Sequence, residues 1–75
     1  MRPPKRVARE FGHAVKRIRL KRHLTQQELA DAVGLDIGYV GGIERGQRNP
    51  TLGVIHSLSS VLGIKSSDLL RKAKL

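Results

Sequence analysis

The side chains best placed for chemistry in this sequence are cations and amides between residues 25 and 50, TQQELADAVGLDIGYVGGIERGQRNP. Guanidinium and amide groups bind phosphate oxygens of any nucleic acid, and helix N-termini add backbone N–H donors. The chain carries 15 Lys and Arg against 6 Asp and Glu, a formal net charge of +9. Such an excess on a small protein attracts polyanions. The composition predicts nucleic acid as the partner, the alternative being that the charge only keeps the protein in solution.

No group of residues in the sequence favours catalysis or metal binding. The chain has no cysteine, which excludes disulfides, thiol catalysis and Cys-based zinc fingers. His13, His23 and His56 lack the i, i+4 pairing of a helical zinc site. Neither a nucleophile elbow nor a glycine-rich phosphate loop ending in Gly-Lys-Ser/Thr is present. We therefore expect neither an enzyme nor a protein that uses a metal or cofactor.

Two short helices with a glycine turn between them are predicted to position the cations and amides. Thr25 and Glu28 form the capping-box pattern that begins a helix, and Gly34 stands where a left-handed residue would end it. Asp36 can cap a second helix over residues 37–45. Two helices with so short a connection must cross steeply. This segment therefore predicts a helix-turn-helix.

Three further helices are expected to complete a single domain. Helical spacing of apolar residues predicts them over residues 7–22, 52–62 and 67–72. Leu52 would belong to the buried stripe of its helix, and Ser66 or Ser67 would cap the last one. No strand pattern is present. The prediction is an all-α, five-helix domain over residues 7–75, preceded by a flexible basic N-terminal arm at residues 1–6.

Length and hydropathy limit where such a protein works. No apolar run approaches the roughly 18 residues that span a bilayer, and no apolar segment of a signal peptide follows the basic N-terminus. We therefore expect a soluble, cytoplasmic protein without a membrane partner. Its 75 residues are near the lower limit at which one core is self-sufficient without disulfides or metal.

Several segments of the chain match one protein family in register. They are Leu24-Thr25-Gln26-Gln27-Glu28-Leu29-Ala30, Val33-Gly34-Leu35, Ile43-Glu44-Arg45-Gly46, Arg48-Asn49-Pro50 and Leu62-Gly63-Ile64, with Arg19 before them. With these segments, residues 11–70 resemble the Xre/Cro/C1 family of helix-turn-helix proteins, which includes phage repressors, restriction-modification controllers and antitoxins. The resemblance implies a lambda-repressor-like domain whose second and third helices form the motif. It also implies a sequence-specific transcriptional regulator, such as a repressor, that binds double-stranded DNA as a homodimer.

The resemblance further implies which residues meet DNA. The base-facing positions are Ile37, Gly38, Tyr39, Gly41 and Gly42. The phosphate-binding positions are Gln26, Gln27, Arg45, Gln47, Arg48 and Asn49, and Arg17 in the first helix could extend them. Gln26 could also brace the recognition helix. Arg19 and Glu44 match a structural pair of the family that fixes the first helix against the recognition helix.

Three of the five base-facing residues are glycines, which have no side chain to read a base edge. Each weakens a helix by about 1 kcal/mol relative to Ala. One explanation is that the helix sits deep in the groove, where Ile37 touches a thymine methyl and Tyr39 donates its hydroxyl. The other is that Gly41 or Gly42 makes room for a neighbouring helix, or that a weak binder tolerates them.

Two other functions remain open for the same domain. One is an antitoxin or adaptor whose helix faces bind a protein. A toxin partner is not indicated, because only RKAKL follows Leu70 and an antitoxin usually needs a neutralising segment. The other is a nucleic-acid binder of low specificity, which the high charge and the glycine-rich helix both allow.

Overall fold

Five helices make up the part of the protein that the computed structural model describes, residues 4–75. They are α1 (Lys5–Lys21), α2 (Gln26–Val33), α3 (Ile37–Glu44), α4 (Leu52–Leu62) and α5 (Ser66–Lys72). No strand occurs between residues 4 and 75, so the expected all-α, five-helix class is confirmed. None of these described helices combines the length and apolar character that crossing a membrane requires.

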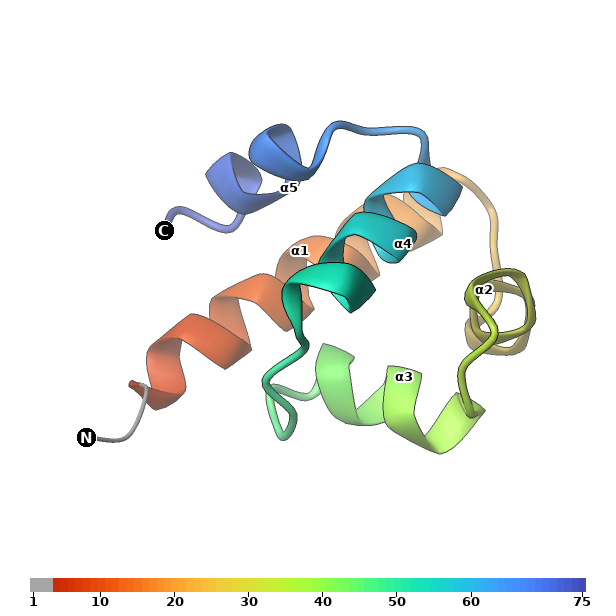
Figure 1. The fold of residues 1–75 in the computed structure, drawn as a ribbon, viewed down its shortest axis with the longest axis horizontal. Coiled ribbons are helices and arrows are strands. Elements are labelled where there is room, and N and C mark those ends of the chain that lie inside the picture. The colour runs from red at the N-terminus through yellow and green to blue at the C-terminus, as the bar shows by residue number, and fades with distance from the viewer. Residues whose placement is uncertain (1–3) are drawn as a thin grey trace.

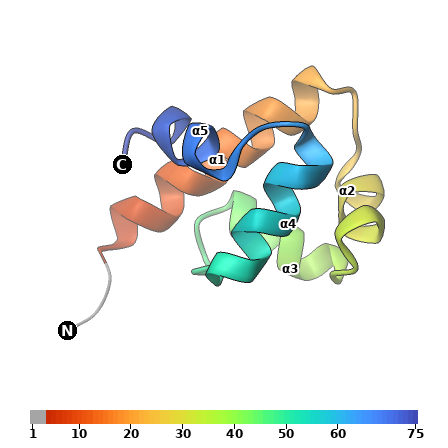
Figure 2. The same ribbon diagram turned by 45° about the horizontal axis from the view of Figure 1, so that its top comes forward.

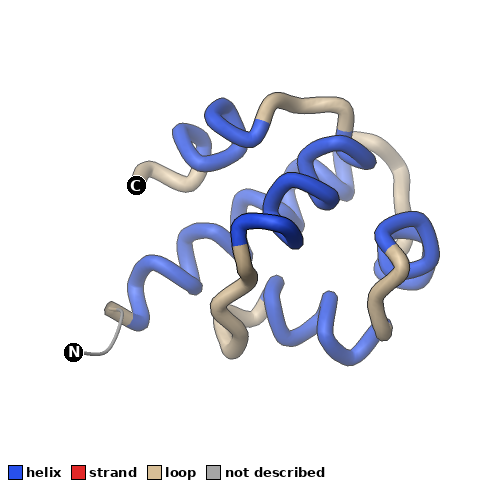
Figure 3. Tube along the Cα trace, viewed as in Figure 1, coloured by secondary structure: helices blue, strands red, loops and turns tan. Residues whose placement is uncertain are grey.

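The long helix α1 runs through the middle of the molecule, with α4 packed along it (Figure 1). Helices α5 and α3 lie on opposite sides of α1, and α2 stands across the end of α3 (Figures 1 and 2). Figure 3 separates the short turn between α2 and α3 from the longer loop that joins α3 to α4. The two helices of the motif are therefore attached to the rest of the domain through α1 and α4.

Helix α1 begins two residues earlier than the sequence pattern predicted. Pro4 is its N-cap, with φ −60° and ψ 136°, and the amide that proline lacks is not needed at a helix N-terminus. Lys5 and Arg6 are therefore helical and do not belong to a flexible arm. Residues 1–3 of the expected arm lie outside the described residues.

The caps predicted for the two helices of the motif are present. The Glu28 amide donates to Thr25 Oγ1 at 3.0 Å, and the Thr25 amide donates to Glu28 Oε1 at 2.8 Å. Gly34 ends α2 in the left-handed conformation with φ 71°, which L side chains adopt at a steric cost. Asp36 Oδ2 accepts from the Gly38 amide at 2.8 Å and so caps α3. The turn is therefore specified by local chemistry, as the sequence indicated.

Two expectations for the C-terminal helices are wrong. Leu52 is 82% exposed, because it occupies the first position of α4, beyond the part of that helix that reaches the core. Neither serine caps α5, whose N-cap is Lys65 without a side-chain hydrogen bond. The Ser66 hydroxyl is instead 2.7 Å from the buried Ser59 hydroxyl of α4. A contact between helices has replaced the local cap.

The core receives at least one fully buried side chain from every helix. Its largest members are Val15, Leu29, Val40, Ile43, Leu58, Leu62 and Leu69. Leu24, Val33, Leu35 and Tyr39 pack against this cluster from the motif side. Burial of these apolar groups is the main favourable term in folding a domain of this size, and it holds the motif on the scaffold.

Gly12 of α1 lies directly against the backbone at the end of α3. A Cβ atom at this buried position would overlap the Ile43 carbonyl oxygen and lie 2.8 Å from that of Glu44. Only a residue without a side chain allows this approach, because the clash is with backbone. Gly12 cannot be singled out from the sequence, because nothing local distinguishes it from any other glycine in a helix.

Candidate nucleic-acid interface

The first residues of α3 form the exposed end of the helix-turn-helix. Ile37 is 40% exposed, and Gly38 beside it is also exposed. Tyr39 is half-buried and packs against the core. Val40 and Ile43 lie on the opposite face of the helix and are fully buried. The start of α3 thus presents the outward surface expected of a recognition helix.

Gly41 and Gly42, which the resemblance assigned to base-facing positions, are buried and not exposed. A Cβ atom at Gly41 would lie 2.9 Å from Nη1 of Arg45, and one at Gly42 would lie 2.9 Å from Cγ of Arg48. The nearest atom from a neighbouring helix is Oε1 of Gln26, 3.7 Å from the position of a Gly41 Cβ. Arginine side chains, and not the backbone of another helix, therefore cover the two glycines.

Both arginines extend from the segment that follows α3, and both are exposed. The Arg45 Nε donates to Oε1 of Gln47 at 3.2 Å. The Arg48 guanidinium carbon lies 5.8 Å from the centre of the Tyr39 ring, within the range of a cation–π contact. Asn49 is exposed in the same segment. The four expected phosphate ligands of this segment are therefore accessible, and two of them lie against α3.

A buried network joins the end of α3 to α1 and α2. Arg19 of α1 donates from Nε to Oε2 of Glu44 at 2.6 Å and from Nη2 to Oε1 at 3.0 Å. Its Nη1 donates to the Leu24 carbonyl oxygen at 2.8 Å. Gln26 Nε2 donates to Oε1 of Glu44 at 2.9 Å. The expected pair is thus present, and Gln26 of α2 is hydrogen-bonded to the end of α3 through the same carboxylate.

The electrostatics of this network favour the charged pair. Arg19 and Glu44 are only 6% and 4% exposed, so each would carry a large desolvation penalty without the other. The hydrogen bonds that Arg19 donates to Glu44 raise the pKa of Arg19 above its already high ordinary value, although burial acts in the opposite direction. Arg19 therefore stays charged at every physiological pH.

The two glutamines at the start of α2 differ in their surroundings. Gln26 is half-buried in the Glu44 network. Gln27 is exposed, and its Nε2 donates to Oδ1 of Asp31 one turn along the same helix at 2.8 Å. Both belong to the first turn of α2, where backbone N–H groups and the positive end of the helix dipole attract anions.

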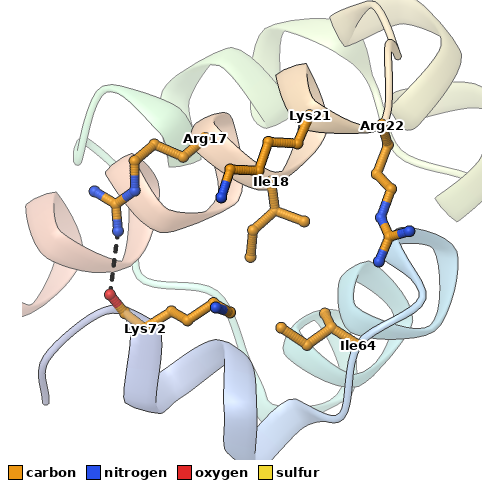
Figure 4. Close-up of a pocket in the computed structure, with 6 residues that line it drawn as sticks. All are labelled: Arg17, Ile18, Lys21, Arg22, Ile64 and Lys72. Atoms are coloured by element: carbon orange, nitrogen blue, oxygen red, sulfur yellow. Dashed lines mark hydrogen bonds between the residues drawn. The ribbon is translucent and has the colours of Figure 1, made fainter.

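Arg17 lies away from this surface, contrary to expectation. Figure 4 shows it with Lys21, Arg22 and Lys72 around a depression of about 420 Å³ between α1 and α5, which Ile18 and Ile64 also line. Arg17 Nη2 donates to the Lys72 carbonyl oxygen at 3.1 Å. Cations are favoured at such helix C-termini. Because α5 and α3 lie on opposite sides of α1 (Figure 1), the structure does not bring Arg17 to the motif.

Comparison with known proteins agrees with this geometry. The helix-turn-helix family model matches residues 15–69. The control protein C.BamHI of Bacillus amyloliquefaciens is 43% identical over 61 residues, which cover 80% of this chain and 75% of that protein. The crystal structure of the restriction-modification controller C.AhdI from Aeromonas hydrophila is 42% identical, with a TM-score of 0.80 over 83% of this chain and 94% of its own.

A second solved structure extends the likeness over nearly the whole chain. The clp gene regulator ClgR from Corynebacterium glutamicum is 29% identical, with a TM-score of 0.87 over 96% of this chain and 74% of its own. No group of three or more His, Asp or Glu residues among residues 4–75 is arranged to hold a metal ion. The family match, the relatives and the geometry of α2 and α3 agree: the chain belongs to the Xre/Cro/C1 family of helix-turn-helix DNA-binding regulators.

Proposed function

We propose that the protein regulates transcription by inserting α3 into the major groove of an operator, as a homodimer on a near-palindromic site. The observation that carries this proposal is the outward end of α3. Ile37 and Gly38 are exposed there, and the Arg19–Glu44–Gln26 network holds the other end of the helix in place. A recognition helix must be fixed in this way, because base edges are read by geometry.

The polar groups around α3 suit contacts with the DNA backbone. Gln26 and Gln27 belong to the N-terminal turn of α2, and Gln47 and Asn49 are exposed in the loop after α3. In a helix-turn-helix the helix before the recognition helix crosses the backbone. We assign these four residues to phosphates on each side of the groove, where they would set the register of α3 without reading sequence.

We infer the homodimer from the two-fold symmetry of the proposed near-palindromic site. Two recognition helices enter successive major grooves about one helical turn apart. Leu52 and Leu75 are large apolar side chains that remain 82% and 51% exposed in one chain, which supports a partner surface near the start of α4 or the C-terminus. The names of the relatives, a control protein, a restriction-modification controller and a gene regulator, support a role in gene control.

Selection of binding sites from random DNA, followed by titration at near-physiological salt, tests the proposal. A regulator of this kind should prefer its selected site over random DNA by about a thousandfold or more, and the site should be a near-palindrome. A preference well below a thousandfold would instead favour a nucleic-acid binder of low specificity. Salt dependence alone does not separate the two, because both bind phosphates.

A further inference from the structure

The two buried glycines of α3 each lie beneath an arginine. Arg45 is four residues after Gly41, one helical turn away, and its Nη1 approaches the position of a Gly41 Cβ to 2.9 Å. Arg48 folds back from the loop, and its Cγ, Nε and Cδ lie 2.9, 3.6 and 3.8 Å from the position of a Gly42 Cβ. The side chains of Arg45 and Arg48 thus fill the space that side chains at Gly41 and Gly42 would occupy.

The path of Arg48 follows the outward face of α3. Gly42 and Tyr39 are three residues apart and therefore neighbours on one face of the helix. The aliphatic part of Arg48 crosses Gly42, and its guanidinium is 5.8 Å from the centre of the Tyr39 ring. Packing against an aromatic face restricts the planar guanidinium, so less freedom is lost when it binds a ligand. Arg48 is therefore held over the recognition helix.

Both guanidinium groups are available to an external acceptor. Among residues 4–75, the arginines that pair with a carboxylate are Arg19, with Glu44, and Arg71, with Asp68. Arg45 donates to the neutral Gln47 side chain. A guanidinium directed at a base edge makes its commonest specific contact with O6 and N7 of guanine, through two parallel hydrogen bonds. A lysine in its place keeps the charge and loses this geometry.

We infer that Arg45 and Arg48, each seated over a glycine of α3, are the base-reading side chains of this recognition surface and select guanine. The inference rests on the proposed insertion of α3 into the major groove. It differs from the phosphate role that the family resemblance implies for the two residues. It also explains why residues 41 and 42 are glycines, since a Cβ at either position would lie 2.9 Å from an atom of the arginine that covers it and would displace that side chain.

Lysine substitution distinguishes base reading from phosphate binding. We expect Arg48→Lys and Arg45→Lys to bind random DNA within about twofold of the wild type with the same salt slope, because the charge is kept. Affinity for the selected site should fall about tenfold or more, and a new selection should lose one guanine per half-site. Arg71→Lys is the matched control, because Arg71 is exposed on α5 and pairs with Asp68.

An unchanged selected motif, with affinity for the selected site and random DNA reduced by the same factor, would place the two arginines on phosphates and overturn the inference. The proposed function would survive that result. Absence of any selected motif in the wild-type protein would instead remove the proposed function, and the inference with it. The two failures are therefore distinguishable from the same set of titrations.

A double-mutant cycle between Gly42 and Arg48 tests whether Gly42 is needed to position the Arg48 side chain. Gly42→Ala places a methyl group where Arg48 Cγ is 2.9 Å away, so we expect it to lower affinity for the selected site when Arg48 is present. In an Arg48→Ala background the same change should alter affinity less than about twofold, because no side chain remains to be displaced. Circular dichroism melting curves confirm that each variant folds.

Equal losses of affinity on Gly42→Ala in both backgrounds would mean that the new methyl group meets DNA directly. That result would support insertion of the helix deep in the groove. It would overturn the proposal that Gly42 makes room for the Arg48 side chain.

Discussion

The side chains of Arg19 and Glu44 join the last turn of α1 to the last residue of the recognition helix through two hydrogen bonds, of 2.6 and 3.0 Å. Both residues are buried. The same carboxylate accepts a hydrogen bond from Gln26 of α2. One acidic side chain therefore links the end of α3 to both α1 and α2, in addition to the core contacts of Val40 and Ile43.

Replacement of Arg19 by Ala should destabilise the fold. The change leaves the Glu44 carboxylate buried without its charged partner, which costs about 3 to 5 kcal/mol. Small domains have little more stability than this, so we expect a largely unfolded protein in a circular dichroism melting curve. Arg71→Ala is the control, since its exposed pair with Asp68 should contribute no more than about 1 kcal/mol. A folded Arg19→Ala protein that only fails to bind DNA would contradict this structural role.

Replacement of Gln26 by Ala should have a smaller effect than loss of Arg19. Glu44 would keep both hydrogen bonds to Arg19 and lose the one from Gln26, a loss of about 1 kcal/mol in the free energy of unfolding. Gln27→Ala removes an equal side chain whose one hydrogen bond is to exposed Asp31, and it should change stability by less than about 0.5 kcal/mol. Urea denaturation measures both, and equal values would show that Gln26 does not brace α3.

The parts of the fold that the sequence predicted correctly are those with a local cause. Thr25 and Glu28 are three residues apart and bond to each other, so their pattern alone begins α2. Gly34 ends that helix with a positive φ of 71°, again for a local reason. Ser66 shows the limit of such patterns, because its hydroxyl is hydrogen-bonded to Ser59 of α4 and does not cap α5. Competition between local and tertiary partners cannot be resolved from a sequence pattern.

Replacement of Gly12 by Ala should destabilise the domain in proportion to the overlap with α3. The added Cβ would meet the backbone carbonyl oxygens of Ile43 and Glu44, and moving them would separate α1 from α3. Overpacking of this kind typically costs about 1 to 3 kcal/mol. We expect a clear fall in melting temperature, together with weaker DNA binding because α3 is displaced.

Gly53 of α4 is the matched control for Gly12. It is exposed, and the nearest neighbour of an added Cβ would be Oγ1 of Thr51 at 3.8 Å, an ordinary contact. Gly53→Ala should therefore leave stability unchanged or raise it by up to about 1 kcal/mol, since Ala favours the helix. If both variants lost stability equally, the close approach of α1 and α3 would not explain the effect at Gly12.

The candidate site was harder to predict than the fold, for a reason that Gly42 illustrates. Family resemblance gave it an outward position on the recognition helix, yet the structure buries it under Arg48. The burial depends on a loop residue that folds back over the helix, and helical periodicity contains no information on such a loop. Gly41 and Arg45 offered a weak signal, because residues four apart on a helix are neighbours.

Replacement of Leu52 by Glu should separate folding from dimer formation. Leu52 is 82% exposed in the single chain, so a charge at this position should change the free energy of unfolding of the monomer by less than about 0.5 kcal/mol. If Leu52 lies in the proposed dimer interface, the variant should dissociate at concentrations where the wild type is dimeric, because an unpaired charge would be buried there. Sedimentation equilibrium measures this change directly. Leu20→Glu, at a 54% exposed position on α1, is the control and should leave the dimer intact; equal weakening by both substitutions would show that the interface does not specifically involve Leu52.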